Sequence, residues 1–415
     1  MALGVAKGRM EKKRLLIIPS WYPLRDDPLR GNFFYEQAKV MADAYDIRVL
    51  VGRLDRRSRA RRLLNTCRYF AGTTTKPTLI DDDVCAPPEK LCFTYETGLS
   101  RFSRTNYELM TTAYRSAFRT LVQEGWVPDL IHAQSVVFGG IAAYVISREF
   151  SIPYVITEHN LFVLSNHPSF IRTDIVKSLE HASRVLTVSH DKSRQLLMWN
   201  LNIEPEVVYN LVDETVFPLQ SALPGSVMRI VSVTAASFLK DNLTLLKALC
   251  ELRRLGVHWV CDLIGLKGWG EDAEYAKLMQ FIADNGLRDT IQMLDAVERS
   301  KMPQSYQNRH VFVLTSIAEG LSVSLLEAMC SGLYVVATRH GGVEEIISDD
   351  RFGKIVNIRD YKAIAQAIAR FQNGTVTYSP EAVRRRVVQL CGREAFTRRL
   401  QGIYDSVLAE PRGRR

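Results

Sequence analysis

The sequence predicts an α/β protein with two doubly wound domains, each built on a parallel sheet. Short apolar segments of strand length alternate with longer segments that repeat apolar residues at helical spacing, and this alternation is typical of parallel sheets covered by helices. The pattern breaks at residues 210–226 and then starts again. At 415 residues, the chain is also longer than one hydrophobic core usually supports, so two domains are expected.

The first half of the chain predicts one sheet, with helices between its strands. Apolar runs predict strands over residues 14–18, 47–51, 129–133, 153–157 and 184–188. Apolar residues at helical spacing predict helices over residues 33–44, 103–123, 137–148 and 169–182. Residues 71–89 are rich in Thr, Asp and Pro, so we expect a loop there.

The break in the pattern predicts the boundary between the domains. Asn210-Leu211-Val212-Asp213 is followed by Phe217-Pro218 and by Leu223-Pro224-Gly225, and Pro and Gly interrupt regular structure. We expect an N-terminal domain over residues 1–210 and a C-terminal domain over residues 211–393. A last segment of helical pattern, at about residues 394–415, is expected to pack back on the first domain.

The second half of the chain repeats the alternation of the first. Apolar runs predict strands over residues 229–233, 259–264, 291–294, 311–314 and 334–337. Helical spacing predicts helices over residues 243–255 and 272–283. Because open α/β sheets bind ligands outside the carboxyl ends of their strands, we expect the functional residues in the loops that follow these strands.

Composition and charge narrow the class of protein. The 47% hydrophobic and 24% charged content is typical of a globular chain, and no apolar run approaches the roughly 18 residues of a membrane span. The net charge of +9 and the pI near 9.2 favour an anionic partner such as a nucleotide, a phosphate, an acidic lipid surface or a nucleic acid. The seven cysteines lack Cys-x-x-Cys spacing, so we expect reduced thiols in a cytosolic protein and no zinc site.

The most biased segment of the chain is rich in arginine. Six arginines lie between Arg53 and Arg62, and Leu63, Leu64 and Phe70 follow them. A run of like charge is most often a solvated or disordered loop. The alternative is a basic, amphipathic edge that contacts anionic lipid head groups or an acidic acceptor. In that case the protein would be cytoplasmic and bind peripherally at the inner face of the membrane through Arg53–Arg62.

Two carboxylates eight positions apart, Glu319 and Glu327, follow the strand predicted at residues 311–314. Their segment predicts a loop and then a helix, which would place one acid and a helix N-terminus at the ligand-binding edge of the sheet. A fully helical segment would put them about 12 Å apart, on the order of the span from the sugar to the ribose of a sugar nucleotide. The alternative is structural, because Ser324-x-x-Glu327 also fits a capping box at a helix start.

Two other loops of the second half carry lysines. Lys240 precedes Asp241, a residue that can cap a helix, and a lysine beside free helix N–H groups is suited to a pyrophosphate. The alternative for Lys240 is a solvated loop lysine. Lys267 lies in a glycine-rich loop, at residues 265–270, whose flexible backbone a base or phosphate could approach.

Two positions of the first half lie beside predicted strands. Gly31 is in the long loop after the first strand, without the G-x-G-x-x-G of a dinucleotide site, and an ordinary turn glycine is the alternative. His159 follows the strand at residues 153–157 and is flanked by Glu158 and Asn160. This place favours contact with a substrate, whereas a lone histidine is usually a structural hydrogen-bonding residue.

As an ordered set, these residues resemble one family, the retaining GT-B-fold glycosyltransferases of family 4. The likeness runs over nearly the whole chain. It rests on the opening loop with Gly31, Glu158-His159, Asn210-Leu211-Val212-Asp213 with Phe217, Lys240, the E-x7-E segment from Glu319 to Glu327, Ala328, Gly332 and Gly341-Gly342. The resemblance implies a GT-B fold, in which two Rossmann-like domains face a cleft and the second holds most of a nucleotide-diphospho-sugar.

The resemblance also implies a role for each site residue. Glu319 would accept hydrogen bonds from hydroxyls of the donor sugar, Glu327 would accept them from the ribose, and His159 would contact the sugar from the first domain. Lys240 would neutralise the diphosphate, and Gly31 would let the backbone approach it. The catalytic residues would therefore be Glu319, His159 and Lys240. No metal and no cofactor is expected, because Lys240 and the helix dipole take the role of a cation.

The remaining expected donor contacts are Gly320-Leu321-Ser322, at the helix start, and Lys267. One position departs from the family. Many members have an arginine five residues before the lysine, where this chain has Ala235. The loss of such a charged contact is worth about 1.5–3 kcal/mol. Lys267 and Arg339 are the candidates to supply the charge.

The sequence therefore predicts a metal-independent enzyme that moves a hexose from a nucleotide-diphospho-sugar to a glycan or lipid-linked acceptor, in cell-surface polysaccharide biosynthesis. A catalytically weak or inactive GT-B protein that serves as a partner or scaffold is the alternative, motivated by Ala235. A sugar-nucleotide epimerase on the same fold is a further alternative. Nucleic-acid binding rests on charge alone, without a recognisable module or stacking motif, so no nucleic acid is expected as a partner.

Overall fold

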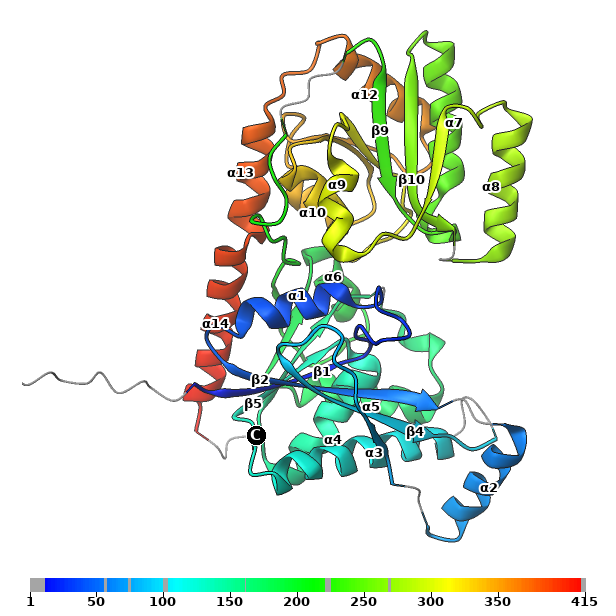
Figure 1. Cartoon of the computed structure of the whole chain (residues 1–415). Helices are drawn as coiled ribbons and strands as arrows, with labels where there is room; N and C mark the ends of the chain where they lie inside the picture. Colours follow the sequence, from blue (N-terminus) through cyan, green and yellow to red (C-terminus); the bar gives the residue numbers. More distant parts are fainter. Residues whose placement is uncertain are drawn as a thin grey trace, which may run out of the picture.

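The structure is a computed structural model that describes residues 12–55, 58–73, 76–99, 104–160, 162–220, 225–267 and 270–411, without the side chains of Arg59 and Lys267. Two α/β units lie one above the other, and the C-terminal helices run along one side of both (Figure 1). Each unit has one sheet whose pairings are almost all parallel. The predicted α/β class with two doubly wound parallel sheets is confirmed.

The first unit is built on an eight-stranded sheet with the strand order β3-β4-β2-β1-β5-β6-β7-β8. Among the strand pairings of this sheet in the described residues, only that of β3 with β4 is antiparallel. The strands are β1 (Arg14–Pro19), β2 (Asp46–Asp55), β3 (Thr78–Ile80), β4 (Glu89–Glu96), β5 (Leu130–Gln134), β6 (Tyr154–Glu158), β7 (Arg184–Thr187) and β8 (Glu206–Val207). The helices are α1 (Asn32–Met41), α2 (Arg59–Phe70), α3 (Arg104–Gln123), α4 (Ile141–Phe150), α5 (Ser169–Glu180) and α6 (His190–Leu197).

The second unit has a six-stranded sheet with the order β11-β10-β9-β12-β13-β14, and its strand pairings are parallel. The strands are β9 (Met228–Val233), β10 (Trp259–Lys267), β11 (Ile291–Asp295), β12 (Val311–Leu314), β13 (Tyr334–Thr338) and β14 (Lys354–Val356). The helices are α7 (Asn242–Arg254), α8 (Asp272–Asp284), α9 (Met302–Tyr306), α10 (Val323–Cys330), α11 (Val343–Ile346), α12 (Tyr361–Gln372), α13 (Pro380–Cys391) and α14 (Arg393–Ala409).

The strand order explains where the predicted site residues lie. β1 lies between β2 and β5, and β9 lies between β10 and β12, so the chain order reverses at β1 and at β9. Open α/β sheets bind ligands at the carboxyl ends of such strands. The loops after β1 and β6 carry Gly31 and His159, and the loops after β9 and β12 carry Lys240 and Glu319. Because parallel strands end at the same edge of a sheet, these loops are brought together in each unit.

The central strands were predictable because helices cover both of their faces. Every residue of β5, β6, β12 and β13 is buried, and strands buried on both faces consist of continuous apolar runs. Within the described ranges, every helix is too short or too polar to span a lipid bilayer.

The C-terminal helix α14 packs on the first unit. α13 contacts α10 of the second unit, and α14 continues from Gly392 along the first unit (Figure 1). The hydroxyl of Tyr404 in α14 lies 2.5 Å from Nδ1 of His132, and its ring packs edge-on against Tyr45. β8 ends at Val207 and β9 begins at Met228. The limits of the domains at residues 210 and 393 stay a prediction.

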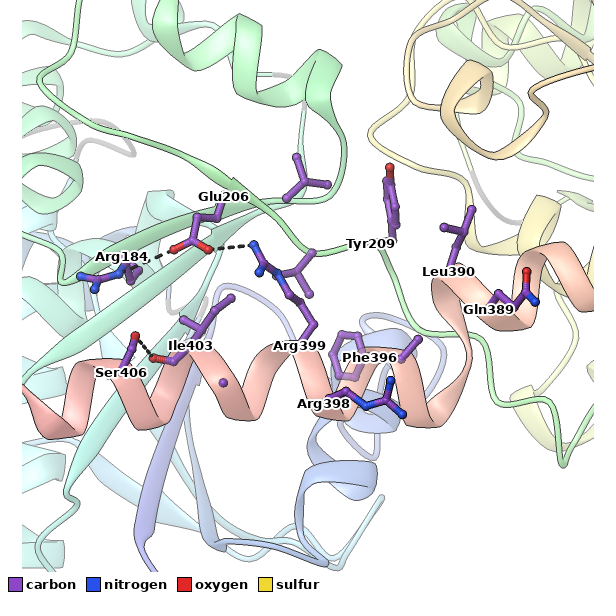
Figure 2. Close-up of a pocket in the computed structure, with 14 residues that line it drawn as sticks. Arg184, Glu206, Tyr209, Gln389, Leu390, Phe396, Arg398, Arg399, Ile403 and Ser406 are labelled. Atoms are coloured by element: carbon purple, nitrogen blue, oxygen red, sulfur yellow. Dashed lines mark hydrogen bonds and ion pairs between the residues drawn. The ribbon is translucent and has the colours of Figure 1, made fainter.

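A pocket of about 700 Å³ lies where α14 meets the edge of the first sheet (Figure 2). On this side, the carboxylate of Glu206 in β8 binds Arg399 of α14 at 2.8 Å and Arg184 of β7 at 3.6 Å. None of the residues that line this pocket is a predicted site residue.

Two segments differ from the expectation. Residues 71–89, expected as a loop, contain β3, whose Leu79 pairs with Phe93 of β4. This strand of three residues was not predicted, because the Thr, Asp and Pro content of the segment is typical of a loop. Its position depends on pairing with β4. Part of the arginine-rich segment forms the helix α2, capped by Ser58, whose hydroxyl accepts a hydrogen bond from the N–H of Arg61. Arg56 and Arg57 lie outside the described residues.

Candidate active site

Lys240 and Glu319 form an ion pair at the ends of two neighbouring strands. Lys240 ends a 3-10 turn after β9, and Glu319 lies in the loop after β12. The Nζ of Lys240 lies 2.5 Å from Oε1 of Glu319, with 29% and 15% of the two side chains exposed. Thr315 donates its hydroxyl to the carbonyl of Lys240 at 3.0 Å, and the N–H of Ile317 donates to the carbonyl of Leu239 at 2.8 Å. These bonds hold the two loops together, so the pair is a fixed part of the sheet edge.

Glu319 is charged in this environment. Burial disfavours its charge, but the ammonium of Lys240, with smaller contributions from His340 and Ser316, outweighs burial and lowers the pKa of Glu319 below its ordinary value. The hydroxyl of Ser316 donates a second hydrogen bond to Oε1 at 2.8 Å. The site thus contains a negative carboxylate, which accepts hydrogen bonds, in contact with a positive ammonium, which donates them.

Glu327 is held by two residues of the segment after β11. It is 2% exposed, forms an ion pair with Arg299, and accepts a hydrogen bond from the hydroxyl of Tyr306 at 2.7 Å. The guanidinium of Arg299 also lies 5.2 Å from the centroid of the Phe217 ring. A carboxylate with two oxygens retains acceptor capacity beyond these two donors.

The capping-box alternative for Glu327 is wrong. α10 begins at Val323, one residue after its N-cap Ser322, and no side chain in the described residues caps it. The hydroxyl of Ser324 instead lies 3.0 Å from that of Ser322. Glu327 is therefore in the second turn of α10, where a side chain cannot reach back to the cap.

His159 lies directly against the loop of Glu319, across the interface between the units. A Cβ added to Gly320 would lie 2.3 Å from the carbonyl oxygen of His159, so only glycine allows this approach. The ring stacks edge-on against Phe34 at 4.9 Å, and its Nε2 lies 2.7 Å from Oε1 of Gln134. Its Nδ1 is buried and has no hydrogen-bond partner among the described residues.

The His159 imidazole is neutral near pH 7. Burial, with a smaller contribution from the charge of His132, lowers its pKa to about 3. The neighbouring Glu158 fixes the loop: its carboxylate accepts hydrogen bonds from the N–H groups of Val136 at 2.9 Å, His159 at 2.9 Å and Asn160 at 2.8 Å. A neutral, fixed imidazole is suited to contact an uncharged hydroxyl.

The segment Gly320-Leu321-Ser322 is held by the first unit and the linker. The hydroxyl of Ser189, the N-cap of α6, donates to the carbonyl of Gly320 at 3.3 Å. The amide of Asn210 donates to the carbonyl of Leu321 at 2.8 Å. Asn210, which was expected in the linker and as part of the family resemblance but without a role of its own, therefore positions the start of α10.

Gly31 occupies the N-cap of α1 with a φ of +78°. A Cβ at this position would lie 2.9 Å from the carbonyl oxygen of Trp21. Glycine is therefore required here by backbone conformation and by space, as the turn-glycine alternative expected.

Which residue supplies the charge that is missing at Ala235 stays a prediction. The carbonyl of Ala235 accepts a hydrogen bond from the amide of Asn242 at 2.8 Å. The Arg339 side chain is 59% exposed and pairs with Glu344 at 3.5 Å. The side chain of Lys267 lies outside the described residues.

Two buried basic residues near the site were missed. His340 follows β13 and is 6% exposed, and neither ring nitrogen has a hydrogen-bond partner among the described residues. Lys192 in α6 is 1% exposed and donates to Oε1 of Gln195 at 3.0 Å. Burial lowers the pKa of both residues. The rule that functional residues follow strands would have found His340, whereas Lys192 lies in α6, where the apolar pattern predicts no helix.

Two family models match the chain. The model described as Glycosyltransferase Family 4 matches residues 31–216, and the model described as Glycosyl transferases group 1 matches residues 217–384. The two matches follow each other without a gap: the first covers the first α/β unit from Gly31 onward, without β1, and the second covers the second unit as far as the start of α13.

Curated relatives match over parts of the chain. A phosphatidylinositol N-acetylglucosaminyltransferase component of Arabidopsis thaliana is 26% identical over 267 residues, which are 63% of this chain and 58% of the relative. The amylovoran biosynthesis glycosyltransferase AmsK of Erwinia amylovora is 29% identical over 186 residues, 43% of this chain and 42% of the relative. The chain thus spans about half the length of the curated relatives it matches.

The fold is shared with solved glycosyltransferase structures. Anabaena HepE in complex with UDP and glucose superposes with a TM-score of 0.69 at 17% identity, covering 95% of this chain and 100% of that chain. At this level of identity the likeness shows the fold alone. With both family models matched in order on the two-sheet fold, the chain belongs to the GT-B glycosyltransferases of group 1.

Proposed function

We propose that the protein is a retaining hexosyltransferase that uses a nucleotide-diphospho-sugar and acts on a glycan or lipid-linked acceptor in cell-surface polysaccharide biosynthesis. The observation that carries the proposal is the contact of Lys240 with Glu319, directly beside the backbone of His159. An ammonium and a carboxylate fixed at one sheet edge are suited to a ligand that joins a negative diphosphate to a hydroxyl-rich sugar.

The pair would work by exchanging partners. When the donor binds, the Lys240 ammonium turns toward the diphosphate and stabilises the negative charge that grows on the leaving group. Glu319 is then free to accept hydrogen bonds from the sugar hydroxyls. His159 would contact the sugar from the first unit. The reaction would retain the anomeric configuration without a protein nucleophile.

The nucleotide would lie along the start of α10. Glu327, oriented by Arg299 and Tyr306, accepts the ribose hydroxyls with its remaining lone pairs. The backbone of Gly320-Leu321-Ser322 faces the phosphates at a helix N-terminus. Gly31 lets the opening loop approach the diphosphate, and Lys267 is a further donor contact.

We assign the role of a cation to Lys240 and the α10 N-terminus, so the reaction would not require a metal. The measurement is the transfer rate after removal of divalent ions with EDTA and after re-addition of Mg²⁺ or Mn²⁺. Equal rates are expected, and activity that is lost with EDTA and restored by either ion would contradict this assignment.

The relatives indicate the first donors and acceptors to test. The Arabidopsis relative is named for N-acetylglucosamine transfer to phosphatidylinositol, the Erwinia relative for amylovoran biosynthesis, and the HepE structure holds UDP and glucose. UDP-glucose and UDP-N-acetylglucosamine therefore lead the donor panel, and lipid-linked glycans lead the acceptor panel.

The main experiment combines binding with turnover. A donor that binds should raise the melting temperature by mass action, and the best donor is then tested for hydrolysis and transfer, with Glu319→Ala as the control. The proposal expects a rate at least 100-fold lower for Glu319→Ala, and a product whose anomeric configuration, read by NMR, matches the donor. Equal rates for the parent and the variant would refute the assigned role of Glu319, and an inverted product would refute retention.

We further propose that α2 binds an anionic membrane surface at the inner face of the membrane. α2 stands at the edge of the first unit (Figure 1), and its Leu63, Leu64 and Phe70 are 51%, 43% and 76% exposed. Part of the Arg53–Arg62 charge is used within the protein, since Arg62 donates to the carbonyl of Leu99 at 2.7 Å. We expect Phe70→Glu to weaken flotation with phosphatidylglycerol vesicles. Equal flotation with neutral vesicles would refute an electrostatic contribution.

An inactive GT-B protein that serves as a partner or scaffold is the second candidate, favoured by Ala235. This candidate predicts no melting shift with any nucleotide sugar. Ala235→Arg is the diagnostic variant: a gain of donor binding there, with none in the parent, would support the inactive form.

A further inference from the structure

The N-terminus of helix α6 in the first unit is capped by a glutamate of the second unit. Oε2 of Glu345, in α11, accepts a hydrogen bond from the N–H of His190 at 3.1 Å, and Oε1 accepts one from the N–H of Asp191 at 3.3 Å. The hydroxyl of Tyr209, in the linker, donates to Oε2 at 3.1 Å. The first N–H groups of a helix have no partner within the helix. The local cap Ser189 binds the third of them, on Lys192, and Glu345 binds the first two across the interface.

Close packing around α6 leaves this end of the helix little freedom. A Cβ added to Gly341 would lie 2.6 Å from Oδ2 of Asp191, and one added to Gly342 would lie 2.7 Å from the carbonyl oxygen of Gly320 and 2.9 Å from Cβ of Ser189. The start of α6 is therefore in contact with two loops of the second unit, the loop that follows Glu319 and the loop that leads to Glu345.

α11 is itself fixed from behind. Arg386 of α13 donates from Nη2 to the carbonyl of Glu345 at 3.1 Å and from Nε to the carbonyl of Ile346 at 3.3 Å. α13 leads directly into α14, which packs on the first unit (Figure 1). Glu345 thus contacts α6 from α11, and α11 is in turn held by Arg386 of α13.

Ser189 links the start of α6, which Glu345 caps, to the loop of Glu319. Ser189, the N-cap of α6, accepts from the N–H of Lys192 at 3.2 Å and donates to the carbonyl of Gly320 at 3.3 Å. Gly320 follows Glu319 and packs on the carbonyl of His159. A shift of the α6 N-terminus would therefore change the approach of the Glu319 loop to His159.

We propose that Glu345 is a positioning residue for the transfer reaction: by capping α6 across the interface, it sets the approach of the Glu319 loop to His159. This inference rests on the proposed function, because it assigns that approach to the reacting sugar. Loss of the cap lowers the fraction of molecules in the binding-competent arrangement, and the apparent donor affinity falls by the same fraction.

The test compares Glu345→Ala with Asp360→Ala, a control variant that also loses a helix cap but within one unit. Asp360→Ala removes the bond from the N–H of Ala363 to Oδ1 of Asp360, which is 3.0 Å long and lies within the second unit at the start of α12. We expect Glu345→Ala to lower kcat/KM for the donor at least tenfold, and Asp360→Ala to leave it within twofold of the parent. Glu345→Gln keeps one acceptor oxygen for the α6 amides, so it should recover part of the loss.

Small-angle scattering of the ligand-free proteins tests the arrangement without turnover. Glu345→Ala should have a larger radius of gyration than the parent, and saturating UDP-glucose should return it to the parent value. If Glu345→Ala matches Asp360→Ala in both scattering and kcat/KM, the inference is overturned. If the parent transfers no sugar, the proposed function is refuted. The scattering comparison does not depend on turnover, so it still decides whether Glu345 holds the two units together.

Discussion

The contact of Lys240 with Glu319 allows a quantitative prediction. The two charges are 2.5 Å apart, and their side chains are 29% and 15% exposed. Coulomb's law with an effective dielectric constant of about 20 gives about 7 kcal/mol of attraction at this distance. Desolvation of two partly buried ions offsets several kcal/mol of this. We therefore expect a net coupling energy of about 2 kcal/mol. This value lies between the ~1 kcal/mol measured for exposed ion pairs and the ~3 kcal/mol at the upper end of the interaction energies between residues in contact.

The coupling is measured by a double-mutant cycle. The free energies of unfolding of Lys240→Met, Glu319→Gln and the double variant are compared with that of the parent by urea denaturation. Lys277 and Glu274 are the matched control, with a similarly covered glutamate (14%) but a lysine that is 74% exposed. Their coupling should be at most about 0.5 kcal/mol.

The same variants separate stability from catalysis. Lys240→Met would remove the proposed charge-assisted contact to the diphosphate, worth about 1.5–3 kcal/mol, so kcat/KM should fall about 10- to 150-fold. A coupling energy below about 0.5 kcal/mol would refute a strong, partly buried ion pair between Lys240 and Glu319. Full coupling with kcat/KM unchanged would show that Lys240 serves only to hold Glu319 in place.

Three other predictions concern buried polar groups. His340→Leu removes two ring nitrogens that lack partners in the described residues, so the free energy of unfolding in urea should rise by about 1–3 kcal/mol; a loss of stability would contradict this. Because the pKa of His159 is lowered to about 3, against about 6.5 in an unfolded chain, the unfolded state binds more protons between these values. Parent stability should therefore decline as pH falls from 6.5 toward 3, and His159→Phe should show a smaller slope; an unchanged slope would show that another group is responsible. Tyr306→Phe removes the hydroxyl that donates to Glu327 at 2.7 Å and should raise the donor KM, with about 1.5–3 kcal/mol lost in stability; unchanged values of both would argue against that contact.

The strand ends of both sheets were accessible from the sequence. Apolar runs of strand length placed Lys240, Glu319 and His159 in loops that follow strands, and parallel strands bring such loops to one edge. The same rule applies to Arg299 and His340, which follow β11 and β13, and it would have marked both as candidates.

Other contacts had no signal in the sequence. Glu345 caps a helix of the other unit, and its partners His190 and Asp191 are more than 150 residues away in the chain. Asn210 looked like a linker residue, and only the folded chain brings its amide to the carbonyl of Leu321. These pairings depend on how the two units meet, which local periodicity does not encode.

Substitutions of Gly320 would change the distance between the two units at their contact. A methyl group there would have to move by about 1 Å to exchange its 2.3 Å approach to the His159 carbonyl for an ordinary contact. The series alanine, serine, valine at this one position would therefore act as a set of spacers of increasing thickness. Such spacers would separate the two units by increasing distances while every charged residue of the site is retained, so the dependence of donor binding and of turnover on this separation could be measured separately.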